Sequence, residues 1–171
     1  MPLATFKHLS PEKQARIRAA LLTEFSQHSL DDAQVARIIK QAHIARGAFY
    51  KYFSDLNDAY CYLYQLAMKD IHQTVTDQGR LLSAGEYLAQ VKHFIESVNE
   101  GPYRDLVRLH YQTNEGLIKG QAGPVPRNAE EWAIMTLVHQ TIKECLLYSA
   151  GQTHSLQYLA TVLDKLLPKE E

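Results

Sequence analysis

The chain has 171 residues, of which 46% are hydrophobic, 22% charged and 9% aromatic. This is the ordinary profile of a folded globular protein, and it excludes a collagen-like, low-complexity or wholly disordered chain. Lys and Arg together number 18 and Asp and Glu 19, so the net charge of −1 also excludes a uniformly basic surface for nucleic acid. The length fits one domain, or one small module joined to a modest one.

The charge is distributed unevenly along the chain. Residues 1–53 hold eight Lys or Arg against four Asp or Glu, a net charge of +4, whereas residues 54–171 hold ten against fifteen. The first third is basic and the rest of the chain is acidic, which indicates different roles for the two parts. A nucleic acid would bind to the first third.

Cysteine usage and the lack of targeting signals predict a soluble cytoplasmic protein. Cys61 and Cys145 lie 84 positions apart and form no disulfide framework, so reduced thiols are expected. The first ten residues lack the apolar core of a signal peptide. The longest uncharged stretch, 145–163, contains Gly, Ser, Thr and Gln, so no membrane span is expected.

Motifs for catalysis and metal binding are absent from the sequence. It contains no HExxH, no His/Cys spacing typical of zinc, no GxSxG, no phosphate loop and no GxGxxG. We therefore expect no metal, no cofactor and no enzymatic activity.

Helical spacing dominates the first third. Ser10 followed by Pro11 predicts a helix start, and apolar side chains then recur on one face up to Phe25. Asp31 or Asp32 is expected to cap a short second helix. A break near residues 42–43 and a third short helix over 45–53 complete the predicted three-helix unit.

The remaining chain also shows helical spacing throughout, so the predicted fold is all-α. Ser54 or Asp55 is expected to cap a long helix that ends near Gly79. Ser83 and Glu86 form a capping box, and Gly101-Pro102 separates the next two helices. The final part reads, in order, as a loop over 119–127, a helix from Asn128 to Ala150 with Gly151 at its end, and a last helix capped by Thr153 and stopped by Pro168.

Three short helices within about 50 residues suit a helix-turn-helix. The third helix of such a unit needs one apolar face for docking and one polar face for base edges. Here Ile44, Ala48 and Phe49 are expected to face inward, with Phe53 closing the end. Arg46, Lys51, Tyr50 and Tyr52 are expected to face outward, and Gly47 allows the backbone close to the groove.

The stretch from Asp31 to Phe53, DDAQVARIIKQAHIARGAFYKYF, closely resembles the DNA-binding domain of the tetracycline-repressor (TetR) family. The family pattern is matched at fixed spacing by a set of eight residues: Ile38, Ala42, Ile44, Gly47, Phe49, Tyr50, Tyr52 and Phe53. The preceding helix also fits, so the resemblance covers about residues 8–60, and beyond that only the helical layout is similar.

The resemblance implies a DNA-binding domain over residues 1–54 and a helical effector-binding and dimerisation domain over 55–171. It further implies a sequence-specific regulator, usually a repressor, that binds double-stranded DNA at a pseudo-palindromic operator in the cytoplasm, at the nucleoid. The last two helices, about 128–150 and 153–167, are expected to form a four-helix bundle across a homodimer. By motif position, the DNA contacts are Gln34, Ala45, Arg46, Gly47, Tyr50, Lys51 and Tyr52.

Several positions depart from the family pattern. His43 stands where the turn Gly is usual, and His tolerates positive φ better than most residues. Ala45 replaces a frequent Ser, and Ile39 replaces a usual Ala. Leu56 stands where a Lys commonly touches phosphate, which predicts that DNA binding depends on basic side chains elsewhere: Lys7, Lys13 or Lys51.

A small apolar effector would suit an aromatic pocket with a few polar points. The candidates for this pocket are Tyr64, Tyr103, His110, Asn114 and Trp132, although for any one of them ordinary core packing is the alternative. Two other functions stay open. One is a helical interaction protein whose head binds DNA weakly and without sequence preference. The other is a metal-binding or enzymatic protein that uses the histidines of the body.

Overall fold

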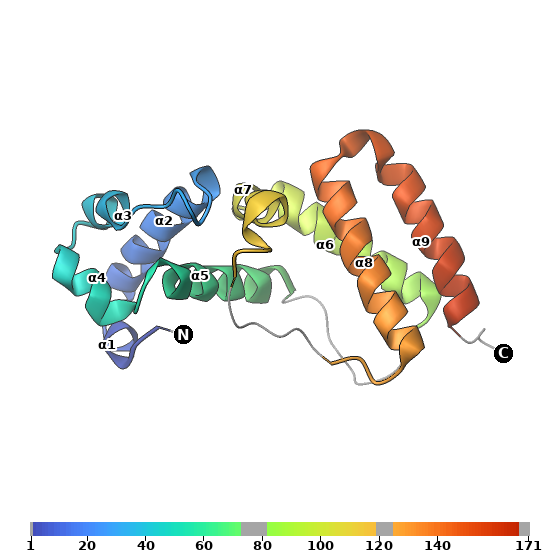
Figure 1. Ribbon diagram of the computed structural model, residues 1–171, viewed down its shortest axis with the longest axis horizontal. Coiled ribbons are helices and arrows are strands. Elements are labelled where there is room, and N and C mark those ends of the chain that lie inside the picture. The colour runs from blue at the N-terminus through green and yellow to red at the C-terminus, as the bar shows by residue number, and fades with distance from the viewer. Residues whose placement is uncertain (1, 73–81, 119–124, 168–171) are drawn as a thin grey trace. The chain divides into compact units, whose positions relative to one another are not determined.

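The computed structural model describes residues 2–72, 82–118 and 125–167 (Figure 1). Within those ranges the chain forms helices and loops and no strand, which confirms the predicted all-α fold. The chain divides into two compact units, Met1–Asp70 with Pro102–Gly120 (unit 1) and Ile71–Gly101 with Gln121–Glu171 (unit 2). The predicted functional boundary after residue 54 concerns roles and stays a prediction.

Unit 1 combines the N-terminal helices with a segment that returns from later in the chain. Its elements are α1 (Ala4–Lys7), α2 (Pro11–Gln27), α3 (Val35–Ala42), α4 (Arg46–Tyr52), α5 (Leu56–Ile71), α7 (Arg104–Leu109) and the π-helical turn η2 (His110–Asn114). Helix α2 packs against both α3 and α7, so it lies at the centre of the unit. One continuous apolar core joins α1 to α5 and reaches Leu106 of α7.

The start of α2 is the one expected from the sequence. Ser10 is the N-cap, its side chain accepts a hydrogen bond from the Lys13 N–H at 3.4 Å, and Pro11 occupies the first turn. The predicted apolar face is buried, since Ile17 and Phe25 are both fully inaccessible. The short helix α1 was not expected, and it buries Phe6 in the same core.

Helix α5 also begins as expected. Asp55 Oδ1 accepts a hydrogen bond from the Asp58 N–H at 2.7 Å, which satisfies one of the free N–H groups of the first turn. Tyr60 and Ala67, which lie seven residues apart on one face of the helix, are buried. The end predicted near Gly79 lies outside the described residues.

The helix that follows Gly101-Pro102 is not α-helical throughout. After α7 the backbone widens into η2, in which the Glu115 N–H donates to the His110 carbonyl at 2.9 Å, five residues back. Such single π-turns inside helices occur often at functional sites. The turn buries His110 and Asn114 together.

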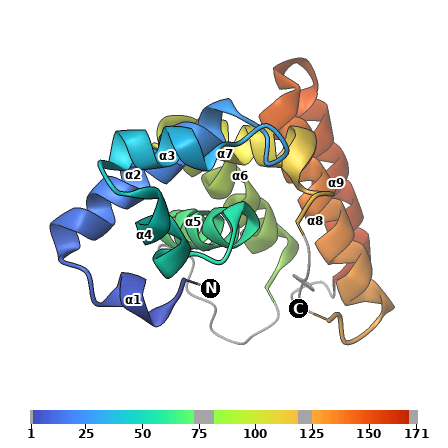
Figure 2. The ribbon, with the colours of Figure 1, turned by 60° about the vertical axis from the view of Figure 1, so that its left-hand side comes forward.

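Unit 2 consists of α6 (Ala84–Glu100), α8 (Ala129–Leu147), the 3-10 turn η3 (Ser149–Gly151) and α9 (Gln152–Leu166). The predicted capping box at Ser83 and Glu86 is present, and Asn128 caps α8 by accepting from the Glu131 N–H at 2.8 Å. In both views α8 and α9 run side by side in opposite directions (Figures 1 and 2). Both also pack on α6.

Three local predictions were wrong. Neither Asp31 nor Asp32 caps α3, whose N-cap is Gln34, and Asp32 Oδ2 instead accepts from the Ser29 hydroxyl at 2.7 Å. Helix α8 ends at Leu147 rather than Ala150, because the chain tightens into η3. Helix α9 begins at Gln152, so Thr153 lies within its first turn and does not cap it.

None of the described helices combines the length and the hydrophobicity needed to cross a lipid bilayer.

Candidate nucleic-acid interface

Helices α3 and α4 are joined by a tight turn at His43. This residue has φ 50° and ψ 51°, and it has the one positive φ among the described non-glycine residues. The Ile44 N–H donates to the Ile39 carbonyl at 3.1 Å, and the His43 N–H donates to the Lys40 carbonyl at 3.4 Å. These two bonds form a Schellman motif, in which a right-handed helix ends at a residue in the left-handed conformation. His43 therefore does what the expected Gly would do, and the predicted turn is confirmed.

Side chains of α2 hold both ends of α3. At the C-terminal end, Arg16 Nε donates to the Ala42 carbonyl at 2.9 Å, which satisfies an acceptor that the helix leaves free. At the N-terminal end, Glu24 Oε1 accepts from the Gln34 N–H at 2.7 Å and from Arg37 at 2.6 Å. Helix α3 is thus fixed in orientation by polar contacts as well as by the core.

Glu24 is only 4% exposed, so its charge needs these donors. Burial raises the pKa of Glu24, but the hydrogen bonds from Arg37 and the Gln34 N–H outweigh it and hold the pKa below its ordinary value. The carboxylate is therefore ionised at neutral pH and stabilises the start of α3.

Helix α4 carries the predicted inward face. Phe49 and Phe53 are fully buried, and Ile44 and Ala48 are partly buried against the same core, as expected. Tyr52 differs from the prediction, because it is only 5% exposed and faces the core instead of the outside. Its spacing of three residues from Phe49 places both rings on one side of the helix.

The buried ring of Tyr52 links α4 to the N-terminal segment. It packs edge-on against Phe6 with ring centroids 6.0 Å apart, and the Lys13 Nζ lies 5.8 Å from its centroid. The Leu3 N–H donates to the Tyr52 carbonyl at 2.9 Å, so α1 closes the end of α4. Tyr52 thus supports the helix, and it also places a cation from α2 beside it.

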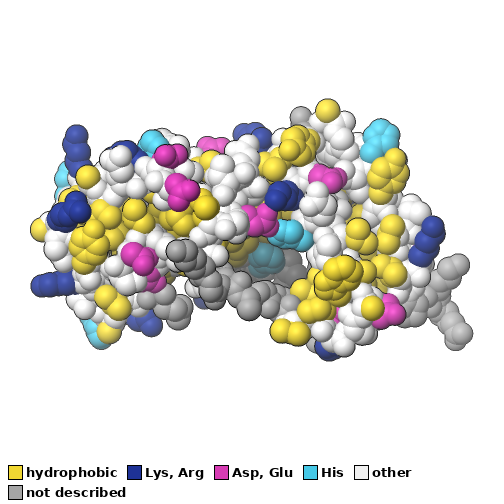
Figure 3. Space-filling model, viewed as in Figure 1, with side chains coloured by type: hydrophobic (Ala, Val, Ile, Leu, Met, Phe, Trp, Pro, Cys, Tyr) yellow, Lys and Arg dark blue, Asp and Glu magenta, His cyan; other side chains and the backbone are white. Residues whose placement is uncertain are grey.

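The opposite face of α4 is exposed and basic. Ala45, Arg46, Gly47, Tyr50 and Lys51 are all exposed, and the Arg46 guanidinium lies over the Tyr50 ring at 5.9 Å from its centroid. In Figure 3, Lys and Arg side chains gather along the α3–α4 edge of unit 1. The predicted contact residues, Tyr52 excepted, thus share one surface with Gln34, the exposed N-cap of α3.

A hollow of about 680 Å³ lies beside this basic face, within unit 1. Tyr50 and Leu56 line it, and the carboxylates of Asp31 and Asp55 lie at it. In Figure 3, hydrophobic side chains on this face have acidic ones on either side of them. Two carboxylates repel phosphate, so the place of the family's usual Lys is unsuited to a phosphate contact here.

Four of the five candidates for the effector pocket lie in unit 1 and contact one another or its helices. The Tyr64 ring stacks on His110 with centroids 4.0 Å apart, and Asn114 Oδ1 accepts from the Leu30 N–H at 2.8 Å. The Tyr103 hydroxyl donates to Asp70 at 2.7 Å, and burial together with this carboxylate raises its pKa to about 12. Trp132, the fifth candidate, lies on α8 in unit 2 and is 60% exposed.

The structure contains a separate hollow in unit 2 that was not predicted from the sequence. Its volume is about 140 Å³, and its lining residues are His72, Tyr87, Gln90, Val91, Phe94, Val138 and Ile142. The apolar face of α6 was visible as a helical stripe. The contribution of α8 was not, because it depends on how two distant helices pack.

Metal and thiol chemistry find little support among the described residues. No group of three or more His, Cys, Asp or Glu side chains in these parts of the chain is placed to hold a metal ion. Burial raises the pKa of both thiols, Cys61 and Cys145, which keeps them protonated and weakly reactive.

Comparison with known proteins agrees with this geometry. Residues 17–55, which include α3, the turn and α4, match the model of the family described as bacterial regulatory proteins, tetR family. The match places the helix-turn-helix of that family in residues 17–55 of this chain. No curated protein matches the sequence significantly.

Solved structures support the same fold over the whole chain. A TetR family transcriptional regulator from Chloroflexus aurantiacus J-10-fl has a TM-score of 0.55 at 21% identity, over 97% of this chain and 96% of its own. A protein from Streptomyces coelicolor, assigned as a transcriptional regulator, has a TM-score of 0.55 at 16% identity, over 92% and 99%. At these identities the likeness shows the shared fold, and the DNA-binding head is the part with a sequence match.

Proposed function

We propose that this protein is a sequence-specific transcriptional repressor of the TetR family that binds DNA as a homodimer and is released by a small molecule. The observation that carries the proposal is the exposed basic face of α4, held on a helix-turn-helix by the His43 turn. A role in regulation rather than catalysis, in the cytoplasm and at the nucleoid, belongs to the same proposal.

In this proposal α4 enters the major groove of one half-site. The Arg46 guanidinium can donate two hydrogen bonds to guanine O6 and N7, and Lys51 is suited to a phosphate or a base edge. Gly47 has no atom within 4 Å of where a Cβ would be, so its backbone is open to the solvent side. Gln34 at the start of α3 would contact the sugar-phosphate backbone. Tyr52, which faces the core, would act on DNA binding by supporting α4.

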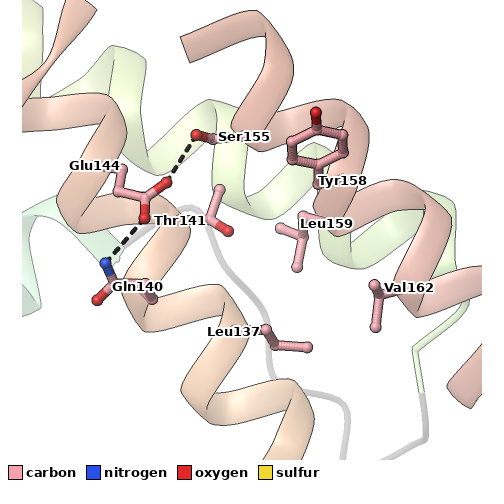
Figure 4. Close-up of a pocket in the computed structure, with 8 residues that line it drawn as sticks. All are labelled: Leu137, Gln140, Thr141, Glu144, Ser155, Tyr158, Leu159 and Val162. Atoms are coloured by element: carbon pink, nitrogen blue, oxygen red, sulfur yellow. Dashed lines mark hydrogen bonds between the residues drawn. The ribbon is translucent and has the colours of Figure 1, made fainter. Parts of the chain in front are cut away.

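The dimer is proposed to form through α8 and α9. Between them lies a hollow of about 160 Å³, with Leu137, Tyr158 and Val162 along it (Figure 4). Tyr158 is 69% exposed and Tyr148 66%, which is unusual for large aromatic side chains on a helical pair. A second copy placed against this face would bury them and complete a four-helix bundle.

The effector is proposed to bind in unit 2, in the hollow of about 140 Å³ between α6 and α8. Its lining is mostly apolar, with His72 and Gln90 as polar points. Its volume is below the roughly 300–1,000 Å³ of typical ligand pockets, so the proposal requires a very small effector or a hollow that widens when the effector binds. In the dimer, the two helix-turn-helix units can be spaced to fit the operator or not. Release from DNA then requires that the effector bind the spacing that does not fit more tightly than the one that does.

The test is selection of duplexes from a random pool at physiological salt, followed by sequencing. An enriched palindrome is expected. Arg46→Ala should then cost about 1–3 kcal/mol at one operator position, whereas Arg104→Ala, which removes an equal charge from α7, should leave the preference unchanged. An equal loss on every sequence would contradict direct readout by Arg46.

The acidic hollow beside α4 favours one alternative, a helical interaction protein whose head binds DNA weakly. That alternative predicts no enriched sequence, and binding that falls steeply with salt to the same extent for all duplexes.

A further inference from the structure

The loop between α2 and α3 is held by side chains from outside it. The Leu30 N–H donates to Asn114 Oδ1 at 2.8 Å, across 84 positions of sequence. At the other end of the loop the Gln34 N–H donates to Glu24, and Arg37 donates to the Asp32 carbonyl at 2.7 Å. Within the loop, the Asp32 and Ala33 N–H groups donate to the Ser29 carbonyl, and Ala33 packs in the core. The contacts from outside join these in holding the loop in place.

Asn114 is itself held firmly in place. Its side chain is fully buried, and it ends the π-turn η2. At the start of that turn, His110 Nδ1 lies 3.0 Å from the Tyr60 hydroxyl and its ring stacks on Tyr64. Helix α5 therefore fixes the turn, and the turn presents the side-chain oxygen of Asn114, Oδ1, to the loop.

The contact between Asn114 and the loop depends on the π-turn. An α-helical continuation of α7 would bring each later residue round by about 100°, whereas the wider π-turn shifts Asn114 relative to that position. Within the described part of the chain, Asn114 Oδ1 accepts from the loop, and the Asn114 side chain also interacts with the Tyr60 hydroxyl of α5.

We propose that Asn114 is a positioning residue for DNA recognition: from η2 it fixes the loop that leads into α3, and thereby the orientation of α3 and α4. The inference rests on the proposed function, because it assigns Asn114 a part in the placement of α4 in the groove. It does not require Asn114 to touch DNA, from which its burial excludes it.

A purely structural role makes a different prediction. If Asn114 only stabilised unit 1, its loss would reduce the folded fraction and weaken binding to every duplex equally. If Asn114 positions the loop, its loss should weaken contacts to bases most, because these require an exact placement of α4 in the groove. Contacts to phosphates tolerate small rotations of the helix. The ratio of affinities for the selected duplex and a random duplex separates the two roles.

The experiment compares Asn114→Leu with Val107→Ala in the full chain, by binding to the selected duplex and to a random duplex. Val107 is fully buried on α7, so V107A removes buried apolar atoms from the helix that leads into η2 while it keeps the bond to Leu30. For N114L we expect a five- to tenfold loss on the selected duplex, about the value of one hydrogen bond. Binding to the random duplex should stay within about twofold of the wild type, because no charge is removed. V107A should keep the wild-type ratio.

Two further variants keep the outcome decisive. Asn114→Asp retains an oxygen acceptor in its neutral form, which burial favours, and should recover most of the discrimination at mildly acidic pH. Asn114→Ser, too short to reach the loop, replaces N114L if that variant does not fold. A wild-type ratio in N114L and N114S, or an equal loss of ratio in V107A, would overturn the inference. A wild-type protein that selects no duplex would instead overturn the proposed function.

Discussion

The two units differ in the partners of their buried polar side chains and in the aromatic side chains that they expose. In the described part of unit 1, three polar side chains are buried, namely Glu24, His110 and Asn114, and each contacts a residue far away in sequence. In the described part of unit 2 the one buried polar side chain is Thr141, and the capping bonds are local. Unit 2 instead exposes Trp132, Tyr148 and Tyr158.

This difference indicates what each unit is suited to. Long-range polar contacts have strict geometry, so unit 1 has a defined orientation of α3 and α4 without help from a partner. Exposed aromatic side chains leave large apolar surfaces of unit 2 in contact with water, which is typical of residues at contact surfaces. We therefore expect changes in unit 1 to act on stability and on the placement of α4, and changes in unit 2 to act on association.

The largest effect is expected from Glu24→Leu in unit 1. The change leaves the Gln34 N–H without its buried acceptor, which should cost about 2 kcal/mol in the free energy of unfolding. Because Arg37 stays partly exposed, its charge can turn to water. Urea denaturation measures the loss, and Glu12→Leu, at an exposed position of the same helix, is the control.

The pH dependence of the same variant checks the cause. Glu24 has a folded pKa below its ordinary value of 4.5, so its contribution is complete above that pH and is lost as the pH falls toward the folded pKa. The difference in unfolding free energy between wild type and Glu24→Leu should therefore shrink below pH 4.5. A difference that is constant from neutral to acid pH would show that packing, not charge, is responsible.

Unit 2 is tested by Tyr158→Glu. If α8 and α9 meet a second copy, a charge on this face should raise the dimer dissociation constant at least tenfold, or about 1.4 kcal/mol. Sedimentation velocity across a concentration series measures it. Gln157→Glu adds the same charge at the neighbouring exposed position and should leave the dimer intact, and equal effects of the two would argue against a dimer through this face.

Gly47→Ala should separate stability from DNA binding. No atom lies within 4 Å of the added Cβ, and Ala has the higher helix propensity, so the free energy of unfolding should rise by about 0.5–1 kcal/mol. Affinity for the selected duplex should fall, because the methyl group stands where the backbone approaches the groove. Thermal unfolding and DNA titration measure the two, and unchanged affinity would mean that Gly47 does not face DNA.

The smallest effect is expected from His43→Gly. Gly removes the strain of a side chain at φ 50° but adds freedom to the unfolded chain, so the net gain should be about 0.5 kcal/mol. Chemical denaturation can resolve it only with replicate curves. A loss of stability would show that the His43 side chain contributes contacts that outweigh the strain.

The sequence was sufficient for the features that are local. The α3–α4 turn, the Asp55 cap and the Ser83–Glu86 capping box each depend on residues within five positions of one another, and each was predicted. The burial of Tyr52 was within reach too, since it lies three residues from Phe49 on a helix. The outward prediction was wrong because Tyr52 lies on the Phe49 side of α4, where its ring packs against Phe6 of α1.

Other features depend on packing between distant segments, which periodicity does not encode. Nothing in the run from Pro102 to Gly120 shows that it packs with the N-terminal helices in unit 1. His110 and Asn114 looked like polar points of a pocket because they stand on an apolar stripe. The partners that they have here, Tyr60 and the Leu30 N–H, lie 50 and 84 positions away.

The π-turn at η2 makes this segment sensitive to chain length. Removing one residue there, such as the exposed Gln112, would let the turn close as an ordinary α-helix with Asn114 still on the side that faces Leu30, because a π-turn holds one residue more than an α-turn. Adding one residue before Asn114 would instead rotate the following side chains by about 100°, and Asn114 would leave Leu30 although no contacting residue had been replaced. The segment that ends in Asn114 should accordingly tolerate exchanges of exposed side chains and one deletion, but not an insertion.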